Sequence, residues 1–213
     1  VDVSLRSPLT LQDMFLVPEE FMLPHVSLKQ YVKLNAPFYP HFSNELLNAC
    51  LRDFDMNEDI HLGELSMGQK KKAFMCFALA TNTSLLMMDE PSNGLDIPSK
   101  SQFRKVIASG MTENKSVIIS THQVRDLENI IDPIIILDRQ DVLLNATIEK
   151  ITEKLYFDYA SEKGDDALYS EMTPGGSIQV KLNMTGEESK VNIEALFNTV
   201  HQHKELIKGI FNK

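Results

Sequence analysis

Several features are scarce in this 213-residue sequence, and each absence narrows the class of protein. The only two cysteines, Cys50 and Cys76, lie in apolar contexts typical of helices. This favours reduced core thiols in a cytosolic protein over a disulfide framework. No apolar run approaches the roughly 18 residues that a membrane span needs, and no signal peptide is visible at the start. We therefore expect contact with a membrane only through a partner.

Positive charge is also scarce. The net charge is −9 at pH 7, and the lysines are scattered apart from one triplet, Lys70–Lys72. A broad basic face for nucleic acid is therefore not expected. None of the nine glycines is followed by lysine, so the sequence lacks the phosphate-cradling pattern G-x-x-x-x-G-K-[ST].

Two adjacent acids follow a short apolar run. Leu85–Met88 is apolar without alternation, which predicts a parallel strand covered on both faces. Asp89 and Glu90 come next, and Pro91 ends the ladder because it has no N–H to donate. Ligands bind at the carboxyl ends of parallel strands. Because paired acids there are costly without a cation or a proton-transfer task, we expect a functional site at this edge.

A second candidate site is the start of a helix. Ser66 and Gln69 have the spacing of a capping box, and residues 73–80 are apolar nearly all round, which predicts a buried helix. Lys70–Lys72 lie in the first turn, where cations oppose the helix dipole. Free N–H groups with added positive charge predict an anion site; a solvated basic turn is the alternative.

A third candidate site lies downstream. Ser116–Ser120 contains another unbroken apolar run and is predicted to be a strand that delivers Thr121 and His122 to its carboxyl end. A single histidine is more often structural than catalytic. Because this strand is expected to run parallel to the acidic one, we predict that His122 belongs to the same site.

Four motifs in this order and spacing resemble those of ATP-binding cassette (ABC) ATPases, over roughly residues 1–150. They resemble, in chain order, the signature motif (Leu65–Gln69), the Walker B strand (Leu86–Glu90), the D-loop (Asn93–Asp96) and the switch histidine (Ser120–His122).

The resemblance implies ATP and Mg²⁺ as cofactors and gives roles to three residues. Asp89 is implied to hold Mg²⁺, through water because this ion keeps much of its hydration shell. Glu90 is implied to polarise the attacking water as general base, and His122 to contact the γ-phosphate. Positioning and charge neutralisation supply most of the catalysis in such reactions.

The resemblance further implies that the helix start completes a site in a second subunit. Ser66, Met67, Gly68 and Gln69 would bind the γ-phosphate of ATP held by the opposite copy, and Asp96 would shape the D-loop across the dimer interface. Met67 stands where the family often has glycine, but its backbone N–H is still expected to point to phosphate.

Two departures from the family pattern concern phosphate and metal. Met14–Val17 is a predicted strand, and Glu19 stands where the family has a glutamine that contacts the metal. A carboxylate can bind Mg²⁺ but adds negative charge; a solvated turn with Glu19 and Glu20 is the alternative. The P-loop would lie upstream of Val1, so we expect a late-starting sequence that is inactive alone; a degenerate cassette is the alternative.

The predicted fold class is α/β, with a P-loop NTPase-like, mostly parallel sheet flanked by helices. An ABC-type ATPase domain is expected at 1–150, with a helical subdomain at about 24–80, and a small C-terminal α+β appendage at 151–213. Further predicted helices lie at 27–34, 43–54, 99–109 (capped by Ser99), 124–129 and 192–208; further predicted strands lie at 1–5, 134–137, 141–145, 155–159 and 178–184, the last with one face buried and one wet.

The resemblance implies the ATP-binding and ATP-hydrolysing subunit of an ABC transporter, peripheral on the cytoplasmic face of the cell membrane. Its partners would be a separate transmembrane permease subunit and a second ATPase subunit, in a homo- or heterodimer. Residues 38–42 resemble bacterial drug- or lipid-exporter subunits, which favours export. A soluble non-transport ABC ATPase and a non-hydrolysing interaction module are the alternatives. Candidates for permease docking are Met22, Leu23, Tyr31 and Phe38, against the alternative that they are core.

Overall fold

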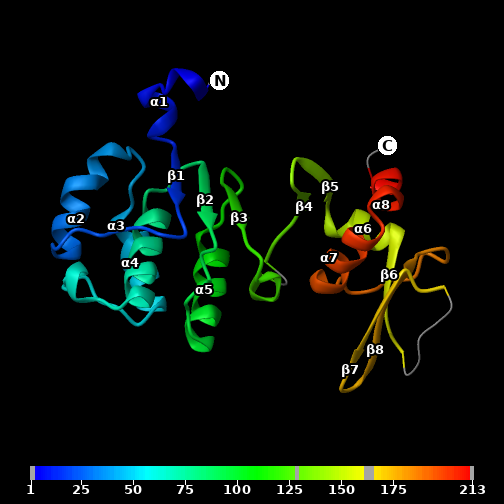
Figure 1. Cartoon of the computed structure of the whole chain (residues 1–213). Helices are drawn as coiled ribbons and strands as arrows, with labels where there is room; N and C mark the ends of the chain where they lie inside the picture. The colour runs from blue at the N-terminus through cyan, green and yellow to red at the C-terminus, as the bar shows by residue number, and fades with distance from the viewer. Residues whose placement is uncertain (1–2, 128–129, 161–165, 212–213) are drawn as a thin grey trace. The chain divides into compact units, whose positions relative to one another are not determined.

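The structure, a computed structural model, describes residues 3–127, 130–160 and 166–211. It divides into two compact units, Val1–Asp126 (unit 1) and Leu127–Lys213 (unit 2). Figure 1 colours the chain from blue at the N-terminus to red at the C-terminus. The predicted end of the ATPase domain at residue 150 falls within unit 2, in helix α6 (Ile148–Lys154). That functional boundary stays a prediction.

Unit 1 is built on a three-stranded parallel sheet. Strands β1 (Met14–Val17), β2 (Leu85–Asp89) and β3 (Ser116–Ser120) occur in the order β1-β2-β3. Val17 pairs with Met88, and Asp89 pairs with Ser120. All three strands were predicted from their apolar runs, and their carboxyl ends meet at one edge of the sheet (Figure 1).

Helix α4 (Met67–Ala80) provides the core of unit 1. Every residue from Ala73 to Ala80 is buried, as its all-round apolar pattern predicts. The ring of Phe77 lies 5.0 Å from that of Tyr31 and 5.4 Å from that of Phe42, and it also contacts Phe15. Burying one such side chain contributes about 1.5–3 kcal/mol, so this aromatic cluster joins the helix to the sheet.

The prediction that Leu85–Met88 is covered on both faces is met only in part, because Leu86 and Met88 are buried whereas Leu85 and Met87 are half-buried. Phe15 and Val17 are buried, whereas Leu16 between them is 52% exposed, and Ile118 on β3 is 56% exposed. Successive side chains of a strand point to opposite faces. The described part of unit 1 therefore covers one face of the sheet more fully than the other, a difference that an all-apolar run does not reveal.

The remaining long helices of unit 1 begin at capping residues. Ser27 forms a capping box at α2 (Leu28–Asn35), and the Ser43 hydroxyl accepts from the Leu46 N–H at α3 (Asn44–Asp53). Ser99 does not cap α5 (Ile97–Gly110) as predicted, because the Asp96 carboxylate accepts its N–H at 2.9 Å. The short helices of the unit are η1 (Val3–Leu5), α1 (Pro8–Leu11), η2 (Ala36–Phe38) and η3 (Leu62–Glu64), and η4 (Val124–Leu127) ends at the first residue of unit 2.

Two predicted end segments differ from the structure. The predicted strand at 1–5 is a 3₁₀-helix over Val3–Leu5, and Val1 and Asp2 lie outside the described residues. The predicted helix at 124–129 is a 3₁₀-helix over Val124–Leu127, with residues 128–129 outside the described part.

Unit 2 combines a hairpin, a sheet and helices. It has an antiparallel pair, β4 (Ile134–Asp138) with β5 (Asp141–Ala146), both close to their predicted ranges. After α6 comes an antiparallel sheet in the order β6-β8-β7. The elements from there on are β6 (Leu155–Ala160), β7 (Tyr169–Thr173), β8 (Gly176–Leu182), α7 (Ile193–Gln202) and α8 (Lys204–Phe211).

The central strand of that sheet corrects one prediction. The alternating pattern predicts that one face of β8 is exposed to solvent. Gln179, a polar residue of that pattern, and Ser177, which precedes it on the same strand, are nevertheless buried. The Ser177 hydroxyl bonds that of Ser170 on β7 at 2.7 Å, and β8 lies between two neighbours, so its polar residues are buried with partners. The helical pattern over 192–208 is likewise two helices, because α7 ends at Gln202.

Both cysteines are free and buried, as the sequence predicts. Burial raises the pKa of the Cys50 thiol to about 11. At neutral pH both thiols are therefore protonated core residues and not reactive thiolates.

Candidate functional site

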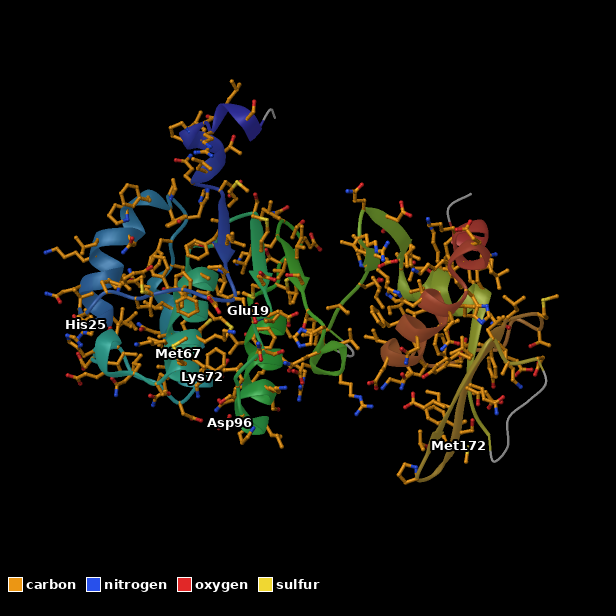
Figure 2. The ribbon with its side chains drawn as sticks, viewed as in Figure 1. Glu19, His25, Met67, Lys72, Asp96 and Met172 are labelled. Atoms are coloured by element: carbon orange, nitrogen blue, oxygen red, sulfur yellow. The ribbon has the colours of Figure 1, made fainter. Side chains whose placement is uncertain are left out.

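The parallel sheet brings three predicted site segments to one edge. Glu19 follows β1, Asp89 ends β2, and the residues after Ser120 follow β3. The Glu90 N–H donates to the Ser120 carbonyl at 2.9 Å, which extends the β2–β3 ladder by one bond. Figure 2 shows Glu19, Met67 and Asp96 on the same unit.

The Glu90 carboxylate is held by the residues after β3. Its Oε2 accepts from the Thr121 hydroxyl at 2.7 Å, and its Oε1 accepts from the His122 N–H at 2.8 Å. The Nδ1 of His122 lies 2.6 Å from the same Oε1. The Glu90 side chain is only 13% exposed, whereas that of His122 is 71% exposed. The structure thus joins the two residues that the sequence nominates as catalytic.

The backbone at Glu90 is unusual for a residue with a side chain. Its φ is +43°, in the left-handed region, where a non-glycine residue costs about 1–3 kcal/mol and persists only when its surroundings enforce it. The Lys71 ammonium donates to the Glu90 carbonyl at 2.9 Å and to the Asn93 carbonyl at 3.0 Å. These bonds support the turn that directs the Glu90 carboxylate toward the residues after β3.

Lys71 is buried, with 6% relative exposure. Burial lowers the pKa of Lys71, while the nearby carboxylates of Glu19, Glu90 and Asp89 act in the opposite direction. A buried ammonium must be hydrogen-bonded to be tolerated, and here its acceptors are backbone carbonyls of the loop after β2.

The lysine triplet as a whole is therefore neither an anion site nor a solvated basic turn, the two alternatives that the sequence left open. Lys71 points inward, and Lys72 donates to the Ser99 hydroxyl at 3.2 Å and lies over the ring of Phe54. Two of the three lysines are thus bound to protein groups. Lys70 is left as the member of the triplet able to add positive charge at the helix tip.

Asp89 and Glu19 are the carboxylates available for a cation. Asp89 is exposed, and its Oδ1 accepts from the Ser120 hydroxyl at 2.6 Å. Glu19 Oε1 accepts from the Asn93 amide at 2.9 Å. No group of three or more metal-binding side chains occurs among the described residues. Mg²⁺ uses one or two carboxylates with water and phosphate oxygens, so the donor set fits that ion when a phosphate accompanies it.

The tip of α4 has the predicted capping box. The Ser66 hydroxyl accepts from the Gln69 N–H at 3.3 Å, and the Gln69 side chain accepts from the Ser66 N–H at 3.0 Å. The hydroxyl proton of Ser66 remains free to donate, and the first N–H groups of a helix have no intrahelical partner. The Met67 side chain at this tip is 61% exposed.

The tip of α4 also lies beside the predicted D-loop. A Cβ on Gly68 would be 3.6 Å from the carbonyl oxygen of Gly94, and Gly94 has a φ of +77°. Asp96 ends this loop as the cap of α5, and hydrogen bonds from Ser99 lower the pKa of its carboxyl. The predicted D-loop thus begins at Asn93, whose carbonyl accepts a hydrogen bond from Lys71, and ends at Asp96, the cap of α5.

Several residues of the site were not predicted individually. The sequence placed Ser120 and Thr121 at the end of the third strand but gave them no role, whereas in the structure their hydroxyls donate to Asp89 and Glu90. Gln123 donates to the Asn93 side chain at 3.3 Å and accepts from Lys100 at 2.8 Å. No sequence signal separates the buried Lys71 from its neighbours.

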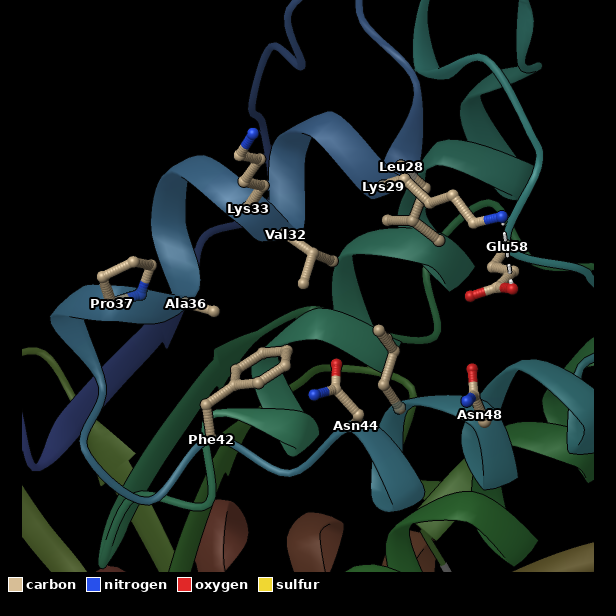
Figure 3. A pocket seen from close by; sticks show the side chains of 11 residues that line it. Leu28, Lys29, Val32, Lys33, Ala36, Pro37, Phe42, Asn44, Asn48 and Glu58 are labelled. Atoms are coloured by element: carbon tan, nitrogen blue, oxygen red, sulfur yellow. Dashed lines mark ion pairs between the residues drawn. The ribbon is translucent and has the colours of Figure 1, made fainter.

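A separate cavity of about 460 Å³ lies between α2 and α3 (Figure 3). The Lys29 ammonium at its rim lies 3.3 Å from the Glu58 carboxylate, an ion pair drawn in the figure. Among the docking candidates, Met22 is 97% and Phe38 is 69% exposed, whereas Tyr31 packs against Phe77. Tyr31 therefore belongs to the aromatic cluster.

Comparison with known proteins gives a consistent class. No family model matches the chain. It is 36% identical over 89 residues to the energy-coupling factor transporter ATP-binding protein EcfA2 of Mycoplasmoides gallisepticum, covering 42% of this chain and 28% of that protein. It is 29% identical over 134 residues to the manganese transport system ATP-binding protein MntA of Synechocystis, covering 63% and 46%. The chain thus spans less than half the length of these relatives.

The fold comparison agrees. A solved ATP-binding subunit of an ABC transporter matches with a TM-score of 0.62 at 22% identity, over 70% of this chain and 65% of that one. This likeness shows that the two chains share an α/β fold. These relatives and the solved structure are ATP-binding proteins or subunits of transporters, and this chain is similar to them over part of their length.

Proposed function

We propose that this chain is part of the ATP-hydrolysing subunit of an ABC transporter, which drives transport through a separate membrane permease. The observation that carries the proposal is the Glu90 carboxylate, held by Thr121 and His122 beside the exposed Asp89. An acid oriented by neighbouring donors next to a second, solvent-accessible acid suits activation of a water beside a metal-bound phosphate.

In this proposal each acid has a distinct task. Glu90 accepts the proton of the attacking water, and His122, whose ring is exposed, contacts the γ-phosphate of ATP. Asp89 and Glu19 hold Mg²⁺, which supplies charge neutralisation when bound. The site residues of this chain position the water and the phosphate.

The tip of α4 serves a second copy in this proposal. Ser66, Met67, Gly68 and Gln69 bind the γ-phosphate of ATP held by the opposite subunit, through the free N–H groups and the Ser66 hydroxyl. Asp96 keeps the D-loop in place by capping α5. The exposure of Met67 at the tip and the closeness of the tip to the D-loop support this assignment.

The partner is a transmembrane permease subunit, reached from the cytoplasmic face of the membrane. None of the helices in the described residues is long and apolar enough to cross a membrane. The exposed Met22 and Phe38 supply apolar contacts for docking. The likeness of residues 38–42 to exporter subunits supports export as the direction.

ATP hydrolysis by the natural gene product that contains this chain tests the proposal. The preparation is purified with any membrane protein that accompanies it, and phosphate release is measured with and without Mg²⁺. Turnover that needs Mg²⁺ and a permease that co-purifies are the expected results. Absence of both would leave a non-hydrolysing interaction module as the better description.

A further inference from the structure

Lys71 is the only Lys, Arg, Asp or Glu among the described residues whose side chain is buried. Removing an ammonium from water is costly unless it is paired or hydrogen-bonded. Its two hydrogen bonds go to the backbone carbonyls of Glu90 and Asn93. The buried ammonium therefore stabilises the conformation of the loop that begins with Glu90.

The segment after β1 also contacts this loop. Glu19 Oε1 accepts a hydrogen bond from the side-chain amide of Asn93 at 2.9 Å, while Lys71 donates to the backbone carbonyl of the same residue. Asn93 therefore links a positive and a negative side chain. Glu19 adds a negative charge near the buried ammonium, where a glutamine would be neutral, and the two charges offset each other.

We propose that Lys71 is a positioning residue, which with Glu19 clamps the Glu90–Asn93 loop and thereby fixes the Glu90 carboxylate against Thr121 and His122. The clamp explains how Glu90 keeps a left-handed φ of +43° without being glycine. Its catalytic consequence rests on the proposed function. The clamp itself is a conformational property of this chain.

Amide hydrogen exchange on the 213-residue chain tests the clamp directly. The Glu90 N–H donates to Ser120 and the Asn93 N–H donates to Glu90, so both amides report on the loop. Bonds to a charged donor contribute enough that Lys71→Met should speed their exchange by roughly tenfold to a hundredfold. Exchange in the strands of unit 2 should not change.

Lys70→Met is the matched control, since it removes the same charge from the adjacent position of α4. The structure gives the Lys70 side chain no hydrogen bond or ion pair among the described residues, so loop exchange should stay at the wild-type rate. Lys71→Arg should restore most of the protection. Equal effects of Lys70→Met and Lys71→Met, or no effect of either, would overturn the proposal.

The second arm of the clamp keeps the test valid if Lys71→Met does not fold. Glu19→Met removes an exposed acceptor and should speed exchange at Asn93 more than at Glu90. In the double variant Glu19→Met with Lys71→Arg, the loop amides should exchange as fast as in Glu19→Met alone. Uniform loss of protection across unit 1 in every variant would instead make Lys71 a general core residue and contradict the clamp.

Turnover separates the clamp from the proposed function. In the natural gene product, Lys71→Arg should retain kcat, whereas Lys71→Gln should lower kcat with the KM for ATP nearly unchanged, because Glu90 is mispositioned and nucleotide contacts are intact. Equal losses in kcat and affinity would contradict a positioning role. If the wild type has no ATPase activity, the proposed function fails, and the exchange experiment still decides the clamp.

Discussion

At the scale of residues, the site depends on how one carboxylate is oriented. Thr121 and His122 bind both oxygens of Glu90, and Lys71 binds its carbonyl. The side chain and backbone of Glu90 are thus fixed by different elements, β3 and α4. This arrangement suits a general base that must hold one orientation, while the exposed His122 ring stays accessible to a ligand.

Glu90→Gln is the most informative single substitution at this scale. Glutamine keeps the size and one acceptor oxygen but has no proton-accepting charge, so turnover by the natural gene product should fall by roughly 10²–10⁴. Steady-state phosphate release measures the change, and ATP binding serves as the control because it should persist. Turnover close to the wild-type value would show that another group is the base.

At the scale of elements, helix caps and strand ends decide where functional residues lie. The capping box of α4 satisfies backbone groups at the start of that helix, and Asp96, the last residue of the predicted D-loop, caps α5. The Ser99 hydrogen bonds lower the pKa of Asp96. The cap therefore stabilises the fold above the unfolded-state pKa of aspartate, and its contribution is lost as the pH falls through the lower folded-state pKa.

Asp96→Asn tests that pH dependence. Asparagine caps helices about as well as aspartate but does not titrate in this range. The variant should match the wild type in thermal unfolding near pH 7, and the loss of stability on acidification should be smaller. Circular dichroism melts from pH 7 down to pH 3 measure this. If both proteins lost thermal stability equally on acidification, Asp96 would be excluded as a contributor to the pH dependence of stability.

Much of this element level could be predicted from the sequence. Apolar runs located β1, β2 and β3, and the spacing of Ser66 and Gln69 predicted the capping box. Which face of a strand is covered could not be predicted, because Leu16 is as apolar as its buried neighbours, and Ile118 is as apolar as the half-buried residues beside it. The same holds for Lys71, since a triplet of lysines does not reveal which member turns inward to backbone carbonyls.

At the scale of the whole molecule, the proposed site is shared between two copies. The acids of unit 1 lie at the carboxyl edge of the sheet, whereas the tip of α4 presents an open hydroxyl and free N–H groups. In the proposal, one copy supplies the base and the metal ligands, and the other supplies the phosphate-binding tip. Such a site predicts that ATP holds two copies together and that hydrolysis separates them.

Sedimentation velocity of the natural gene product carrying Glu90→Gln tests this shared site most directly. With Mg²⁺ and ATP the account predicts a dimer, because binding is intact and hydrolysis is blocked; without nucleotide it predicts a monomer. Adding Ser66→Arg, which blocks the tip of α4, should abolish the dimer while ATP still binds the monomer. A monomer under all conditions, or a dimer that ignores both ATP and Ser66→Arg, would contradict the account.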